Sequence, residues 1–228
     1  MAATLRQRID QVRHVIATAA NKSGRDPAAV TLVAVSKTVD RPMIDAAYQL
    51  GLRHFGENRV QDAVNRFDPP LPPDAELHMI GQLQTNKVRL GLSVFTMIES
   101  VDRPSLVQAL DKEAARIGRR LPVLIQVNVA GEDQKAGCAP EQTSGLIQLV
   151  QESAWLDLRG LMTIGPLVDE PEAIRPVFAG LRSLRDQVRD NDGSPSLDVL
   201  SMGMTNDYAI AIEEGATEVR VGRAIFQP

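Results

Sequence analysis

The sequence predicts a single parallel (β/α)8 barrel, and three observations lead to this fold class. Short runs rich in Val, Ile and Leu alternate eight times with helical segments along the 228 residues, which is the pattern of a parallel sheet. Hydrophobic residues make up 43% of the chain and aromatic residues only 4%, so the core is expected to be aliphatic. Eight strands favour a closed barrel over an open doubly wound sheet, and no G-x-G-x-x-G follows the first strand.

An extra helix is expected ahead of the barrel, from Thr4 to about Asn21. One apolar stripe runs along it at helical spacing, formed by Leu5, Ile9, Val12 and Ile16. Thr4 and Gln7 match a capping box at its start, and Gly24 is placed to end it. We expect this helix to pack across one end or the side of the barrel.

The strands and the remaining helices are predicted from residue type and turn signals. The expected strands are β-branched and aliphatic runs at residues 31–37, 53–58, 77–81, 94–99, 123–129, 158–164, 197–202 and 218–225. The expected helices between them span residues 42–50, 59–67, 104–118, 140–153, 171–190 and 207–214. The proline-rich segment 69–73 is too short to divide the chain, so we expect one domain over residues 1–228.

Composition excludes several classes of function. The net charge is −4 and no basic block is present, which argues against a nucleic-acid partner. No apolar signal core opens the chain, and no stretch approaches the ~20 apolar residues of a membrane span, so a cytoplasmic protein without a membrane partner is expected. Cys138 is the only cysteine, which excludes an intrachain disulfide. His14, His54 and His78 lack metal-ligand spacing, so no metal site is predicted.

Lys37 is the first candidate for chemistry, because sites in such barrels lie where the strands end. It closes the apolar run TLVAVSK, in which alternation puts Val33, Val35 and Lys37 on one face. If that face is the barrel interior, Lys37 points into the barrel mouth. Desolvation would then lower its pKa and make its amine a nucleophile. The alternative is a lysine whose amine reaches solvent at a strand end.

The segment SMGMTND, residues 201–207, is the second candidate. Gly203 permits close backbone approach where the seventh strand leads into a helix. An anion site would combine the helix-opening amides with nearby hydroxyls: the amides of Met204, Thr205 and Asn206 and the hydroxyls of Ser201 and Thr205. Gly222, after the eighth strand, would supply another bare amide. The alternative is an ordinary helix start capped by Thr205 or Asn206.

Arg220 is the third candidate. Alternation in EVRVGR places it on the same face as Glu218 and Gly222. An arginine buried within a strand is costly unless it is paired. It therefore either serves a site or forms a buried ion pair, with Glu218 or Asp198 as the expected partner.

These residues lie in motifs that resemble a known family. AVSK, HFGENRVQ, HMIGQLQTNK and SMGMTNDYAIAIEEGATEVRVGRAIF, in this order, are similar to the pyridoxal phosphate homeostasis protein family over nearly the whole chain. The last motif also resembles alanine racemase, whose N-terminal domain is the same kind of barrel (fold type III of enzymes that use pyridoxal 5′-phosphate, PLP).

The resemblance implies roles for individual residues. Lys37 would form a Schiff base with PLP, Arg220 would face the pyridine nitrogen, and Asn58 would lie beside the ring. The phosphate would be held by the segment that follows the seventh strand and by the glycine that follows the eighth, namely Ser201, Gly203, Met204, Thr205 and Gly222. The sequence departs from the family at Thr205, where serine is common, and at Arg223, where a small hydroxyl residue is usual.

Three functions fit this pattern. The first is a PLP carrier in vitamin B6 homeostasis without a dedicated reaction, which fits the permanent charge of Arg220 because a cation there weakens the ring as an electron sink. The second is a weak amino-acid racemase, although only Tyr48 and Tyr208 are available as a second base. The third is a Schiff-base aldolase without PLP. The carrier is expected to be a monomer, and delivery of PLP to apo-enzymes is left open.

Overall fold

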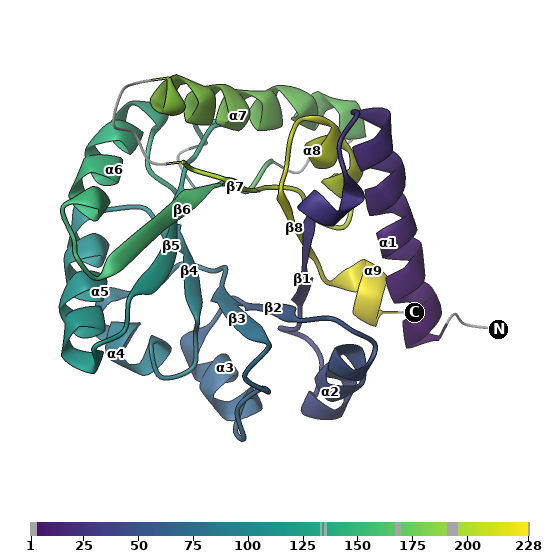
Figure 1. Cartoon of the computed structure of the whole chain (residues 1–228), viewed down its shortest axis with the longest axis horizontal. Coiled ribbons are helices and arrows are strands. Elements are labelled where there is room, and N and C mark those ends of the chain that lie inside the picture. The colour runs from purple at the N-terminus through teal and green to yellow at the C-terminus, as the bar shows by residue number, and fades with distance from the viewer. Residues whose placement is uncertain (1–3, 133, 135, 167–169, 191–195, 228) are drawn as a thin grey trace.

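Eight parallel strands close into a barrel in the computed structural model, which describes residues 4–132, 134, 136–166, 170–190 and 196–227. Each strand pairs with the next in sequence, and β1 pairs with β8 to close the ring (Figure 1). The strands are β1 (Thr31–Val35), β2 (His54–Glu57), β3 (Glu76–Met79), β4 (Met97–Val101), β5 (Leu121–Gln126), β6 (Leu156–Met162), β7 (Val199–Ser201) and β8 (Glu218–Val221). The predicted (β/α)8 fold is therefore confirmed.

Helices surround the barrel on the outside (Figure 1). They are α1 (Leu5–Lys22), α2 (Arg41–Gln49), α3 (Val60–Arg66), α4 (Val88–Gly91), α5 (Pro104–Ile117), α6 (Thr143–Gln151), α7 (Arg175–Arg189), α8 (Tyr208–Glu213) and α9 (Arg223–Phe226). Short 3-10 turns occur at η1 (Pro27–Ala29), η2 (Thr85–Lys87), η3 (Pro140–Gln142) and η4 (Pro171–Ile174). Within the described ranges, no helix combines the length and the apolar character needed to cross a membrane.

The extra N-terminal helix, α1, forms as predicted. Thr4 Oγ1 accepts a hydrogen bond from the Gln7 amide and Gln7 Oε1 accepts one from the Thr4 amide, which completes the capping box. The helix packs along the side of the barrel against α8 and α9 (Figure 1). Arg8 Nε donates to the Ile225 carbonyl at 2.7 Å, so α1 is tied directly to the end of the chain.

Most strand boundaries differ from the predicted ones by a few residues, and three differences change the course of the chain. The fourth strand begins at Met97 rather than at residue 94, after a short helix, α4, that was not predicted. The expected last strand, 218–225, ends at Val221, and the chain turns at Gly222 into α9. The long helix expected over 171–190 divides into η4 and α7, because Pro176 lies in the first turn of α7 and lacks an N–H to continue a preceding helix.

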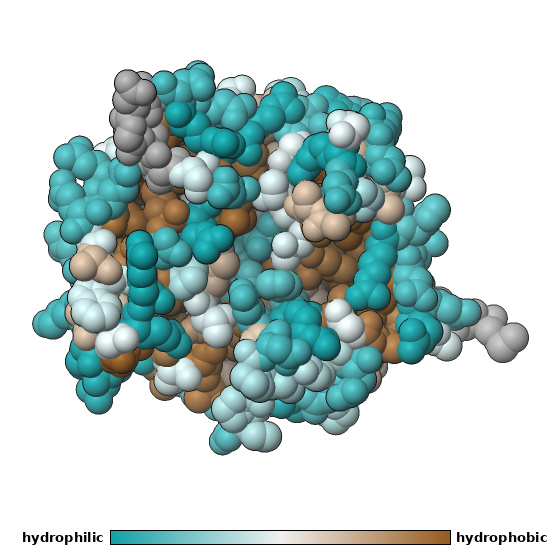
Figure 2. Space-filling model, in the orientation of Figure 1, coloured by the Kyte–Doolittle hydropathy of each residue, from teal (hydrophilic) through white to brown (hydrophobic). Residues whose placement is uncertain are grey.

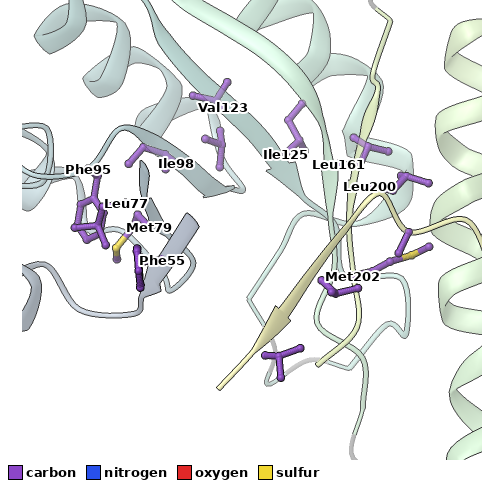
Figure 3. Packing of buried hydrophobic residues seen from close by; sticks show 14 of the residues in the cluster. Phe55, Leu77, Met79, Phe95, Ile98, Val123, Ile125, Leu161, Leu200 and Met202 are labelled. Carbon is purple, nitrogen blue, oxygen red and sulfur yellow. The ribbon is translucent and has the colours of Figure 1, made fainter. Parts of the chain in front are cut away.

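The core has two parts with different chemistry. Outward-facing strand residues and neighbouring side chains pack beneath the helices in one large hydrophobic cluster, which includes Phe55, Leu77, Met79, Phe95 and Ile98 (Figure 3). Inside the barrel, a smaller apolar cluster forms around Met97, Leu124 and Met162. Buried polar and charged side chains also lie there: His78, Glu99, Ser201, Glu218 and Arg220. The barrel interior is therefore a charged network that leads toward the strand ends.

Hydrophilic side chains cover most of the rim of the molecule in the view of Figure 2. Brown hydrophobic residues are seen between them, nearer the middle of this face.

Candidate functional site

A cavity of about 570 Å³ lies at the carboxyl ends of the strands. This volume is in the range of small-molecule sites, about 300–1,000 Å³. Six of the eight residues predicted for the site line it: Lys37, Asn58, Met204, Thr205, Arg220 and Gly222. The remaining two, Ser201 and Gly203, are not in the lining, but in the sequence they closely precede Met204, which is. The barrel therefore brings together segments that are up to 185 positions apart, from Lys37 to Gly222.

Lys37 lies in the cavity lining, two residues beyond the end of β1. Val35 lines the same cavity, so the face of the strand that carries Val33, Val35 and Lys37 is the interior one, as predicted. The expected desolvation is wrong, because the Lys37 side chain is exposed at the open mouth of the cavity. Its backbone carbonyl accepts a bond from Arg66 Nη2 at 3.4 Å. Across the described part of the chain no carboxylate pairs with its amine, which leaves the amine free for a ligand.

Arg220 is buried and points from β8 to the base of the cavity. Its Nη1 donates to Ser201 Oγ at 2.5 Å and its Nη2 donates to the Thr163 carbonyl at 2.7 Å. Glu99 Oε2 lies 3.9 Å from Nη1 and supplies the opposite charge. The ion-pair partner is therefore Glu99 of β4, not the expected Glu218 or Asp198. The guanidinium of Arg220 is therefore paired with Glu99 on the side away from the cavity, and it also borders the cavity, where a ligand can reach it.

Ser201 lies beneath the cavity rather than in its lining. Its hydroxyl donates to Glu99 Oε2 at 2.7 Å and accepts from Arg220. In this structure it fixes the arginine between two strands, which is a positioning role that the sequence did not reveal.

Gly203 is needed for close packing of the chain on itself. Its φ is +93°, in the left-handed region that favours glycine. A Cβ at this position would lie 2.5 Å from the Ala211 Cβ and 2.9 Å from the Tyr208 Cα, so a side chain would collide with α8. The Gly203 carbonyl accepts from the Arg220 amide at 3.0 Å. Gly203 thus allows the backbone to approach closely, as expected, and the element that it approaches is α8.

The loop between β7 and α8 is organised by Asp207. Its Oδ1 accepts a hydrogen bond from the Met204 amide at 2.6 Å. The prediction that this amide is available to an anion is therefore wrong. Burial raises the pKa of Asp207, although the Met204 amide and the charge of Arg220 oppose this change. The amides of Thr205 and Asn206 have no acceptor among the residues the structure describes, and both residues line the cavity.

Arg223 crosses from the start of α9 to this loop. Its Nη2 donates to Asn206 Oδ1 at 3.3 Å, and it also lines the cavity. The preceding Gly222 lies against the end of β1, where a Cβ would be 3.0 Å from the Val35 carbonyl oxygen. The loops after β7 and β8 thus present two unpaired amides and a cation on one side of the cavity, an arrangement that suits a phosphate group.

Asn58 is half-buried in the lining, on the opposite side. The segments after β2 and β3 touch there, because a Cβ on Gly81 would lie 2.3 Å from the Asn58 carbonyl oxygen. Gly81 also lines the cavity and was not among the predicted residues. Its position directly after the third apolar run was the available signal.

A buried acid–histidine network supports the cavity floor. His78 Nδ1 is 2.8 Å from Glu99 Oε1 and 3.8 Å from Glu218 Oε2. Burial and the charge of Glu99 raise the pKa of Glu218 to about 8. Burial opposes the charge of Glu99, but His78, Arg220 and Ser201 together hold its pKa below the ordinary value. Glu99 is therefore the ionised member that balances Arg220.

Comparison with known proteins identifies the family. The model described as "Alanine racemase, N-terminal domain" matches residues 8–228. A pyridoxal phosphate homeostasis protein of Aquifex aeolicus is 40% identical over 220 residues, which cover 96% of each chain. The protein of the same name from Pseudomonas aeruginosa is 41% identical over 223 residues, 98% of this chain and 95% of that one. This chain belongs to the pyridoxal phosphate homeostasis protein family.

Solved structures share the fold of this family member over nearly its whole length. A protein of Bifidobacterium adolescentis superposes with a TM-score of 0.88 at 38% identity, covering 97% of this chain and 94% of that one. PipY of Synechococcus elongatus, solved with PLP bound, has a TM-score of 0.83 at 34% identity and is covered completely, with 98% of this chain. Alanine racemase of Clostridium difficile, at 12% identity and a TM-score of 0.70, shares the barrel fold over 56% of its length.

Proposed function

We propose that this protein binds PLP through a Schiff base to Lys37 and acts as an intracellular PLP carrier without a dedicated reaction. The observation that carries the proposal is the composition of the cavity. An unpaired lysine amine, two loops with free amides and a buried arginine line the same 570 Å³ space. PLP has an aldehyde, a phosphate and a ring nitrogen, and each of these groups finds a matching partner there.

The residues fit the groups of PLP individually. The Lys37 amine would displace the aldehyde oxygen as water when the carbon–nitrogen double bond forms. The amides of Thr205 and Asn206, together with Arg223, would hold the phosphate. Arg220 would face the ring nitrogen, and because Ser201 and the Thr163 carbonyl fix its guanidinium, the positive charge stays in place. A fixed cation there disfavours a protonated ring and so weakens electron withdrawal by the cofactor.

The carrier is favoured over the racemase-like enzyme by the places of the tyrosines. Tyr48 donates to Asp74 Oδ1 at 2.6 Å, on the outside of the barrel. Tyr208 is buried, and neither tyrosine is among the described residues that line the cavity. Neither tyrosine is therefore placed, in the described structure, to serve as the second base of a two-base proton transfer. We further propose that the protein is a cytoplasmic monomer that gives up PLP to amines, including the lysines of apo-enzymes.

Borohydride reduction tests the Schiff base. The wild type, Lys37→Ala and the surface control Lys112→Ala are each incubated with PLP, reduced and mapped by peptide mass. We expect the phosphopyridoxyl label on Lys37 in the wild type and in the control, and none at a defined position in Lys37→Ala. A label spread over surface lysines in the wild type would contradict the proposal and favour the aldolase alternative.

A racemisation assay separates the carrier from the enzyme. Wild-type protein loaded with PLP is incubated with common L-amino acids, and the D-isomers are measured. The carrier predicts no sustained turnover and, instead, transfer of PLP to a competing amine. Continuous formation of a D-amino acid that is lost in Lys37→Ala would establish the racemase-like alternative.

A further inference from the structure

Three potential metal ligands meet at the end of the barrel opposite the cavity. They are His54, the first residue of β2, and Glu76 and His78 of β3. The parallel register sets His54 beside Glu76, and alternation turns Glu76 and His78 to the same face of β3. Sequence spacing gave no sign of this group, because two of its members are 24 positions apart and meet only through strand pairing.

We propose that His54, Glu76 and His78 form a binding site for a divalent transition-metal ion, with zinc as the best fit. Two imidazoles and one carboxylate are the ligand set of many zinc sites that keep a fourth position open. The proposal does not depend on PLP and concerns a different end of the molecule.

The spacing of the ligand atoms matches this coordination. His54 Nδ1 and His78 Nε2 are 3.3 Å apart. Glu76 Oε2 lies 3.6 Å from His54 Nδ1 and 3.5 Å from His78 Nε2. Zinc bonds of about 2.0–2.1 Å in a tetrahedron require ligand atoms about 3.3–3.4 Å apart. One ion can therefore reach all three atoms with shifts of a few tenths of an ångström.

The surroundings of His78 are those of a metal-bound histidine. Its second ring nitrogen, Nδ1, lies 2.8 Å from Glu99 Oε1, which would fix the ring and the tautomer that frees Nε2 for the ion. The Glu99 carboxylate adds negative charge behind it. Glu76 is about half exposed, so the ion has access from solvent.

Without an ion, the same atoms can form a proton-linked network. His78 Nδ1 lies 2.8 Å from Glu99 Oε1 and its Nε2 lies 3.5 Å from Glu76 Oε2, so a proton on the ring can take the place of an ion. The charges that favour this proton also favour a cation in its place, and the ion would displace it. The experiment must therefore distinguish stoichiometric metal binding from a hydrogen-bonded cluster that binds none.

Zinc titration by calorimetry at pH 8, after treatment with a chelator, provides the test. We expect one zinc ion per wild-type chain. His54→Gln and Glu76→Gln, at partly exposed positions, should each weaken binding at least tenfold. His14→Gln is the matched control, because His14 is an exposed residue of α1 outside the cluster, and it should bind zinc as the wild type does. Lys37→Ala should also bind zinc normally, so failure of this proposal is distinguishable from failure of PLP binding.

Cobalt supplies a second readout that does not depend on affinity. The wild type with one equivalent of cobalt should show the visible absorption of a four-coordinate site, and His54→Gln should not. No stoichiometric binding by the wild type would overturn the proposal in favour of the proton-linked network. Equal binding by the wild type, His54→Gln and Glu76→Gln would overturn it in favour of scattered surface sites.

Discussion

Glu57 illustrates at the scale of a residue how the barrel keeps charges beside its site. It is fully buried at the end of β2, where its Oε1 accepts from Ser36 Oγ at 2.6 Å and from Arg66 Nη1 at 2.8 Å. Its Oε2 has no hydrogen-bond partner in the described structure. Burial raises the pKa of Glu57, and the bonds from Ser36 and Arg66 only partly offset this effect.

Glu57 should therefore make stability fall as pH rises. A carboxyl with a raised pKa binds its proton more tightly in the folded chain than in the unfolded chain. Its contribution to the free energy of unfolding is complete below the pKa of the unfolded chain, near 4.5. This contribution is lost as pH rises through the higher pKa of the folded chain. Glu57→Gln removes this titration, so the stability of the variant relative to the wild type should increase across that window. Urea unfolding between pH 4 and pH 7 measures it, and a constant difference between the two proteins would contradict the assignment.

Single residues were predictable where the phase of one strand decided their direction. Lys37 and Arg220 point into the barrel because every second residue does. The partners of Arg220 were not predictable, because Glu99 lies on β4, Ser201 on β7 and Thr163 directly after β6, and barrel closure alone brings them together. The same reason hid the meeting of His54 with His78.

At the scale of elements, the loop from β7 to α8 depends on Gly203. Gly203→Ala would force a side chain into the left-handed region, at about 1–2 kcal/mol, and overpack α8 at a further cost of about 1–3 kcal/mol. Because the loop also holds Thr205 and Asn206 at the cavity, PLP affinity should fall together with the free energy of unfolding. Fluorescence titration with PLP and urea unfolding measure the two effects.

Gly145→Ala is the matched control for that substitution. Gly145 is exposed on α6 and a Cβ there meets nothing within 4 Å. Alanine should stabilise this helix by about 0.5–1 kcal/mol and leave PLP affinity unchanged. If Gly203→Ala behaved like Gly145→Ala, the packing role of Gly203 would be wrong.

The types of element were predictable from periodicity, while some boundaries were not. Residues 218–225 (EVRVGRAI) were predicted as one strand, yet the strand ends at Val221 because the chain must turn at Gly222 to lie against the end of β1. Apolar residues near Phe95 suggested an early start of the fourth strand. Phe95 is buried, but it lies in the turn after α4. Apolar residues after Val221 and before Met97 are buried by packing against other elements, and the sequence pattern alone does not distinguish them from strand residues.

At the scale of the whole molecule, closure joins the two ends of the chain. β1 pairs with β8, and α1 packs on α8 and α9, the helices that follow the ends of β7 and β8. The main hydrophobic cluster contains residues from α1 through α9, including Ile9 and Phe226. A core that is shared in this way leaves no place for an independent subdomain, so we predict that residues 1–228 unfold as one cooperative unit.

Two probes at opposite ends of the barrel can test that prediction. Trp155 directly precedes β6 at the amino-terminal end, and PLP on Lys37 would report from the carboxyl end. Their denaturation midpoints should coincide, because loss of either end opens the shared core.

The substitution Ile9→Ala removes a buried side chain of α1. It should reduce the free energy of unfolding by about 2–5 kcal/mol and so lower both midpoints together. Ile117→Ala, at an exposed position, should change stability by less than about 0.5 kcal/mol. If Ile9→Ala released PLP well before the Trp155 signal changed, α1 and the last helices would form a separate folding unit, and the prediction of one domain would be wrong.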